Sequence, residues 1–110
     1  MKLFKDAIIY DGTGSEAFKG DILVEGDRIL KVEDFIQPED GWKIIDLKGL
    51  SVSPGFIDAH SHNDWFAIKN NPQKYFEPFI RQGITSFVTG NCGLSAVGFD
   101  SDSQHVDKVG

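Results

Sequence analysis

The sequence predicts a mixed fold, with a β-rich first part over residues 1–52 and an α/β second part over residues 53–110. In the first part, short runs of β-prone residues alternate with turn residues. The dipeptide Gly26-Asp27 lies between two such runs and is typical of a tight hairpin turn. In the second part the order changes to strand, loop, helix and strand, which is the order of a βαβ unit.

The first part contains four candidate strands. Residues 3–10 predict the first strand, and the turn sequence DGTG follows it. The runs DILVE and RILKV flank Gly26-Asp27 and predict a hairpin. WKIIDLKG, residues 42–49, predicts another strand with its turn. Short strands separated by turns indicate a β-sandwich segment or a single β-layer.

The second part begins at Pro54-Gly55 with two apolar runs. Residues 55–60 and 84–90 have the length and composition of strands that are buried on both faces, as in a parallel sheet. Residues 61–65, SHNDW, predict a polar loop. Residues 96–110 are small and polar and predict no element.

A helix is expected between these two strands. Tyr75, Phe76, Phe79 and Ile80 recur on one helical face. Pro78 interrupts that pattern and is tolerated best in a first turn, so the helix is expected to start near Glu77. Gly83 is expected to end it.

Composition excludes several functional classes. The chain has 110 residues and a net charge of −6 without a cluster of Lys and Arg, which disfavours nucleic-acid binding. It has no apolar run of roughly 18 residues, so no membrane span is expected. The first residues have no long apolar segment of the signal-peptide type, and a cytoplasmic location is expected. The single cysteine, Cys92, cannot form an intramolecular disulfide.

His60 and His62 are the first candidate metal ligands. Side chains two residues apart on a strand point the same way, so the two histidines aim at one point if the strand continues through them, and imidazole is a common zinc ligand. Both histidines follow an apolar strand, at the end where parallel α/β folds build their sites. The alternative is a pair of surface loop histidines without a role. Asp58 either orients a histidine or caps the loop, and the sequence does not choose between these.

Cys92 follows the second apolar strand, between Gly90 and Gly93. If the two strands are parallel, its thiolate lies at the same end as the histidines and is a strong zinc ligand. The alternative is a structural cysteine. Asn91 either donates hydrogen bonds to such a site or supports the turn. Asn63 and Asp64 are either polar neighbours of the site or, as the simpler interpretation, solvated loop residues. The remaining candidates are expected to be a tail residue without a role (His105) and packing residues (Trp42, Trp65).

Two motifs resemble a known family. PGFIDAHSHND resembles the metal-binding signature of the amidohydrolase superfamily, whose (β/α)8 barrel carries His-x-His on its first strand. FEPFIRQGITSFVTGNCGLS resembles the second-strand region of the N-acyl-D-amino-acid deacylases, the D-aminoacylase branch. The resemblance covers essentially residues 1–100 and implies an N-terminal β-sandwich segment that leads into the barrel.

The resemblance implies roles for three residues. His60 and His62 match the histidines of the first barrel strand, and Cys92 matches the metal-binding cysteine of this branch. The implied cofactor is Zn²⁺, with one or two ions, and the implied reaction is metal-assisted hydrolysis of a small N-acyl-D-amino acid. Asp58 and Asn91 are expected, from their positions in the sequence, as outer partners of the ligands. Asn63 stands where the family frequently has an acidic residue.

The family's later ligands and its catalytic aspartate would lie beyond Gly110. The chain is therefore expected to be the N-terminal fragment of a longer enzyme, inactive alone and prone to self-association through open sheet edges. Two alternatives remain within the enzymes, a dihydroorotase- or hydantoinase-like cyclic amidohydrolase and a deaminase. A third is a non-catalytic module that binds metal or associates with itself.

Overall fold

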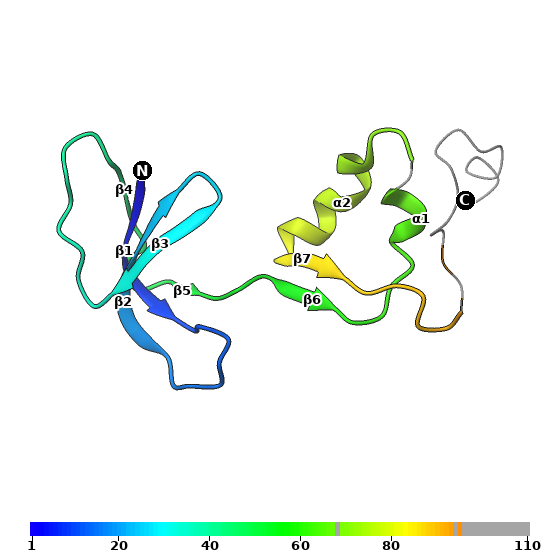
Figure 1. Ribbon diagram of the computed structural model, residues 1–110, viewed down its shortest axis with the longest axis horizontal. Coiled ribbons are helices and arrows are strands. Elements are labelled where there is room, and N and C mark those ends of the chain that lie inside the picture. Colours follow the sequence, from blue (N-terminus) through cyan, green and yellow to red (C-terminus); the bar gives the residue numbers. More distant parts are fainter. Residues whose placement is uncertain (68, 94, 96–110) are drawn as a thin grey trace. The chain divides into compact units, whose positions relative to one another are not determined.

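The computed structural model describes residues 1–67, 69–93 and 95. The chain divides into two compact units, Met1–Pro54 and Gly55–Gly110 (Figure 1), close to the predicted boundary. The expectations for His105 and for residues 96–110 lie outside the described residues. No helix in the described ranges is long and apolar enough to cross a membrane.

The first unit is built on a five-stranded sheet. The strands are β1 (Lys2–Ile9), β2 (Phe18–Glu25), β3 (Arg28–Glu33), β4 (Lys43–Asp46) and β5 (Ser51–Val52). They follow the order β3-β2-β1-β4, and β5 also pairs with β1. The predicted hairpin at Gly26-Asp27 is confirmed, since β2 and β3 are antiparallel and Gly26 has the positive φ of 58° that such a turn requires.

A β-bulge in β1 explains why two short strands follow its edge instead of one long strand. The register of β1 shifts between Phe4 and Ala7, and Asp6 there has a φ of 56°. Opposite the bulge, the backbone N–H groups of Leu47 and Gly49 donate to the carbonyls of Lys5 and Asp6. The parallel pairing therefore stops at β4, turns, and resumes at β5, which the sequence pattern did not predict.

Asp21 holds the bulge in place from within the sheet. Asp21 is buried, with only 3% of the residue exposed. One carboxylate oxygen accepts from the Asp6 N–H at 3.0 Å, and the other accepts from Lys5 Nζ at 2.6 Å and from the Ile36 N–H at 2.9 Å. Burial raises the pKa of the Asp21 carboxyl, but the hydrogen bonds from Lys5, Ile36 and Asp6 outweigh it and hold the pKa below its ordinary value.

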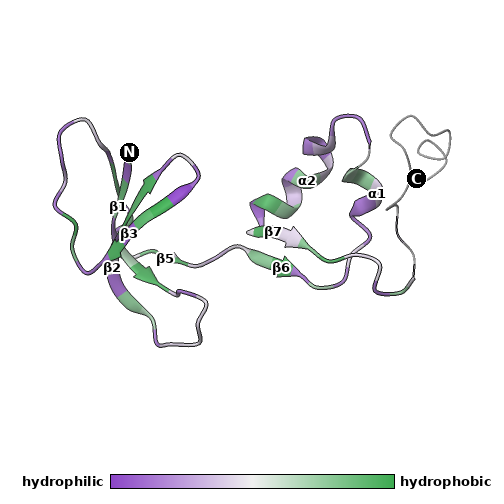
Figure 2. Cartoon of the chain, in the orientation of Figure 1, coloured by the Kyte–Doolittle hydropathy of each residue, from purple (hydrophilic) through white to green (hydrophobic). Residues whose placement is uncertain are grey.

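Apolar clusters lie on both faces of this sheet. Leu3 belongs to one cluster and its chain neighbour Phe4 to the other, and adjacent residues of a strand point to opposite faces. Trp42 packs against the first cluster, as predicted for a packing residue. The described residues of the first unit form one sheet and not two, so this unit contains the β-layer but not a complete sandwich. A single sheet cannot cover both of its apolar faces, and strands β1–β3 contain much of the hydrophobic colour in Figure 2.

The second unit contains β6 (Phe56–Asp58), α1 (Asp64–Ala67), α2 (Pro72–Arg81) and β7 (Ile84–Phe87). The predicted parallel pairing of its two strands is confirmed. Phe76 of α2 stacks on Phe87 of β7 with ring centroids 5.6 Å apart, which fixes the helix on the strand. Gly55, just before β6, is needed because a Cβ at this position would collide with the side chain of Thr85.

The predicted start of the long helix was wrong. α2 begins at Pro72 and not near Glu77, with Asn71 before it at a φ of 66°. Pro72 occupies the first turn, where its missing N–H costs nothing, and Pro78 lies inside the helix. Stacking of the helix aromatics on their neighbours outweighs the hydrogen bond that Pro78 cannot donate. Gly83 follows the helix as predicted, with a φ of 85°.

The expectation that both strands of this unit are buried on both faces was also wrong. Phe56 is 61% exposed and Ile57 67% exposed. A parallel strand is buried only when neighbouring strands and helices cover it on every side. Within the described residues, β6 has one partner strand, β7, and Figure 2 shows β6 as a hydrophobic segment.

We propose that the 110-residue chain self-associates through this unit. Exposed apolar side chains beside unpaired strand edges recruit other chains. Light scattering is expected to give a mass above that of a monomer, and the variant Ile57→Lys, which places a charge beside the edge, is expected to lower it. A parent chain that stays monomeric at the same concentration would contradict the proposal.

Candidate metal centre

The first loop of the site leaves the carboxyl end of β6. Asp58 ends the strand, and its Oδ1 accepts the backbone N–H of His60 at 3.2 Å. Of the two roles left open for Asp58, this contact is the loop cap, since it is made to the backbone and not to an imidazole ring. After His62 the chain turns at once into α1, where the N–H of Trp65 donates to the carbonyl of His62.

The second loop leaves the carboxyl end of β7 and lies along the first. The Val88 N–H donates to the Asp58 carbonyl at 2.8 Å, and the Ser61 N–H donates to the Val88 carbonyl at 3.0 Å. These bonds extend the parallel pairing beyond the strands. Asn91 then donates from its side chain to the Ala59 carbonyl at 3.1 Å. Two roles were predicted for Asn91, donating hydrogen bonds to the site or supporting its own turn. The structure describes a donated hydrogen bond, which runs to the facing loop.

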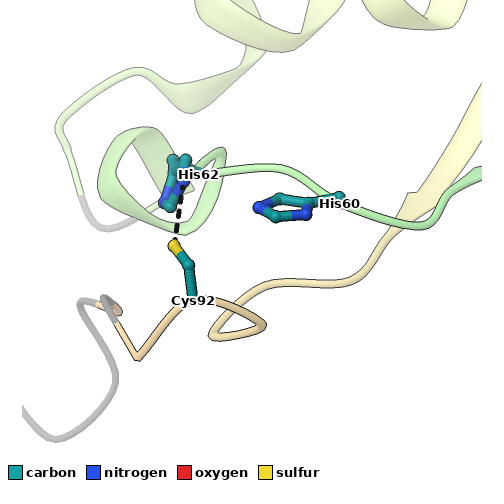
Figure 3. A group of neighbouring side chains, drawn as sticks. All are labelled: His60, His62 and Cys92. Carbon is teal, nitrogen blue, oxygen red and sulfur yellow. Dashed lines mark hydrogen bonds between the residues drawn. The ribbon is translucent and has the colours of Figure 1, made fainter.

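The structure brings His60, His62 and Cys92 together. One ligand atom from each lies within 4.8 Å of the others, and all three residues are exposed. Cys92 Sγ is 3.5 Å from His62 Nε2, and the two imidazole rings meet edge to face with centroids 5.8 Å apart. Figure 3 shows the histidines on one loop and the cysteine facing them from the other. The prediction that these residues share one end of the sheet is confirmed.

The donor set and its spacing fit a zinc ion. Zinc bonds of about 2.05 Å to nitrogen and about 2.3 Å to sulfur, at tetrahedral angles, place neighbouring N and S ligand atoms about 3.6 Å apart. The separation between Cys92 Sγ and His62 Nε2 is 3.5 Å. A modest approach of His60 would bring the third donor to a similar distance, since its ligand atom is already within 4.8 Å. Two imidazoles and one thiolate are a set that zinc binds readily.

Asn63 and Asp64 are not the solvated loop residues that the sequence predicted. Each is only 7% exposed, and Asp64 begins helix α1. The carbonyl of Asn63 accepts the N–H groups of Phe66 and Ala67, which closes the helical turn. An Asn followed by an Asp is a helix-start signal that could have located this turn, although four residues are too few for a periodic pattern.

Ser95 was missed altogether by sequence reasoning. Its hydroxyl donates to Asp64 Oδ2 at 2.9 Å and lies 3.4 Å from the hydroxyl of Thr89. A small polar residue in a Gly-rich segment carries no signal that separates it from an ordinary loop serine. Only the approach of the two loops makes it a contact of the site.

No family model matches the chain. Among curated proteins, it is similar to an N-acyl-D-aspartate deacylase of Alcaligenes xylosoxydans xylosoxydans, 44% identical over 89 residues, which is 81% of this chain and 17% of that protein. A D-aminoacylase of the same organism is 37% identical over 93 residues, which is 84% of this chain and 18% of that protein. The chain thus spans less than a fifth of the length of these relatives.

A solved structure agrees with the sequence comparison. A D-aminoacylase variant in complex with copper chloride matches with a TM-score of 0.74 and 37% identity, over 89% of this chain and 20% of that one.

A dihydroorotase of Staphylococcus aureus is 42% identical over a shorter stretch of 62 residues, which is 56% of this chain and 14% of that protein. The similarity to the N-acyl-D-aspartate deacylase and to the D-aminoacylase thus covers more of this chain than the similarity to the dihydroorotase does.

Proposed function

Because this chain belongs to the D-aminoacylase branch of the amidohydrolase superfamily, we propose that it supplies the first metal ligands of a zinc-dependent enzyme that hydrolyses N-acyl-D-amino acids. The observation that carries the proposal is the convergence of His60, His62 and Cys92 from two loops at one end of a parallel strand pair. Similarity to named deacylases over more than 80% of the chain supports the same class of substrate.

The three side chains would hold the metal through two ring nitrogens and one sulfur. His60 and His62 would each offer a ring nitrogen from one loop, and Cys92 would offer a thiolate from the other. A zinc ion bound there would polarise an amide carbonyl and lower the pKa of a coordinated water molecule. The hydrogen bonds between the two loops hold the three donors near one another before metal binds. Less conformational entropy is therefore lost when the metal binds.

We further propose that β6, α2 and β7 are the opening βαβ unit of a (β/α)8 barrel. The support is the parallel pairing of β6 with β7 and the position of all three donors after the carboxyl ends of those strands. Barrel enzymes place their active sites at that end of their strands. The exposed Phe56 and Ile57 are the kind of side chains that further strands and helices of a barrel cover.

The test is an assay of the full protein that contains this chain. N-acetyl-D-aspartate, N-acetyl-D-glutamate and N-acetyl-D-leucine are supplied with zinc, and release of the free D-amino acid is measured against the matching L-substrates. The proposal expects turnover of at least one D-substrate and loss of turnover after chelation. Zinc-loaded protein that releases no D-amino acid would refute it.

A dihydroorotase-like cyclic amidohydrolase is the second candidate. The observation that favours it is the 42% identity to the Staphylococcus aureus dihydroorotase. That similarity covers 56% of the chain, whereas the deacylase similarity covers 81%. Dihydroorotate as a further substrate, with formation of its ring-opened product as the readout, separates the two, because only the cyclic amidohydrolase opens this ring.

Replacing His60 or His62 with Ala is expected to weaken zinc binding far more than folding. Both side chains are exposed, so their removal leaves no cavity, whereas each supplies one of three donors. Isothermal titration with zinc is expected to show a loss of about 100-fold or more in affinity, since even outer partners of a ligand are worth 10–100-fold.

A thermal melt beside that titration supplies the control for folding. The melting temperature of each histidine variant is expected to stay close to that of the parent without metal. Parent-like zinc affinity in a folded His60→Ala or His62→Ala chain would remove that residue from the ligand set.

A further inference from the structure

Two hydrogen bonds join the two loops on either side, in sequence, of the candidate ligands, and each is donated by a side chain of the second loop. Asn91 donates to the carbonyl of Ala59, and Ser95 donates to the carboxylate of Asp64. In sequence, Ala59 and Asp64 bracket both histidines, and Asn91 and Ser95 bracket Cys92. The bond between Cys92 and His62 therefore lies between two separate ties that join the same two loops.

The tie at Asp64 has the stronger physical basis. The carboxylate belongs to a residue only 7% exposed, and it accepts the Ser95 hydroxyl at 2.9 Å. A hydrogen bond to a charged acceptor away from water is worth more than one between neutral groups. Asp64 is also anchored at its backbone, because it begins α1 directly after the histidine loop. The acceptor is thus fixed to the first loop, and the donor belongs to the second.

We propose that Asp64 and Ser95 are a positioning pair, which holds the Cys92 loop at the distance where its thiolate and the two imidazoles bind one metal ion. The inference rests on the proposed metal centre. Neither residue touches the metal in this assignment. Their effect passes through the second loop around Cys92, where Gly90 and Gly93 both have a positive φ and where the exposed Cys92 gains no rigidity from burial.

The pair predicts a specific change when it is broken. Without the hydroxyl of Ser95, the carboxylate of Asp64 loses this hydrogen bond to the second loop, and the loop around Cys92 is held less firmly on the side of Ser95 than on the side of Asn91. The thiolate should then leave the metal more readily than the histidines do, because both histidines remain on the loop that is continuous with α1. A general loss of stability would weaken all three ligands alike.

The experiment uses cobalt(II) as a spectroscopic probe for the metal, added to the purified chain. A thiolate bound to cobalt gives a charge-transfer band in the near ultraviolet, which reports Cys92 and not the histidines. Ser95→Ala and Asp64→Ala are each expected to lower that band and to weaken cobalt binding about tenfold, the lower end of what outer partners of ligands contribute. The double variant is expected to lose less than the sum of the two single variants, since both single variants remove the same bond.

Conservative and matched variants separate positioning from simple stability. Ser95→Thr keeps a hydroxyl and is expected to retain the band, and Ser86→Ala, at an exposed serine on β7, is expected to match the parent. A parent chain that shows the thiolate band, with Ser95→Ala and Asp64→Ala equal to it, overturns the positioning pair and leaves the metal centre standing. A parent chain without any thiolate band overturns both.

Discussion

Replacing Cys92 with Ser is expected to lower the zinc affinity of the chain by about 100-fold or more and to remove most of the proposed hydrolase activity. The thiolate belongs to the single cysteine of the sequence and is one of three donors that converge. A serine hydroxyl is a far weaker ligand because it stays protonated near neutral pH, whereas zinc binds the deprotonated thiolate. Isothermal titration with zinc measures the affinity, and metal analysis of the purified protein measures the stoichiometry.

The exposure of Cys92 supplies an independent check on the same assignment. As the single cysteine, it is the only site for a thiol-specific disulfide reagent. Zinc is expected to protect the parent from this reagent. The protection is expected to be lost in the variant His62→Ala, because in the parent the His62 ring nitrogen lies 3.5 Å from the thiol. Normal zinc content together with near-normal turnover in Cys92→Ser would remove Cys92 from the ligand set.

Replacing Asp21 with Ala is expected to cost the first unit about 3 kcal/mol of unfolding free energy, the range for breaking a buried charged network. The change leaves the N–H groups of Asp6 and Ile36 without their carboxylate acceptor and takes the partner from Lys5. Urea unfolding followed by the fluorescence of Trp42, in a Trp65→Phe background, reports this unit selectively.

Asp27→Ala is the matched control, because the Asp27 side chain is 96% exposed and its removal is expected to cost less than about 0.5 kcal/mol.

Unfolding at acid pH gives a second test of the Asp21 network. The pKa of Asp21 is lower in the folded chain than its ordinary 3.8, so its stabilisation is complete above that value and is lost as the pH falls through the folded pKa. Asp21→Ala should therefore lose less stability than the parent over that range, and equal slopes would contradict the role of the network.

Patterns that depend on neighbours in sequence were readable without a structure. The hairpin at Gly26-Asp27, the end of the helix at Gly83 and the histidines after an apolar strand each follow from local backbone preferences or from periodicity. The meeting of Cys92 with the histidines was also predictable, because parallel strands present their carboxyl ends at the same edge. The sequence motifs that contain these three residues resemble the metal-binding signature of a known family.

Features that depend on contacts distant in sequence were decided only by the tertiary structure. Asp21 lies 15 residues from both Asp6 and Ile36, and nothing local marks a buried aspartate that holds a bulge and a loop. Asp64 and Ser95 are 31 residues apart and looked like ordinary loop residues until the two loops met. Pro78 was misjudged because stacking of α2 on its neighbours outweighs the hydrogen bond it cannot make. Local propensity is worth less than such contacts, and their energy exists only once the chain is folded.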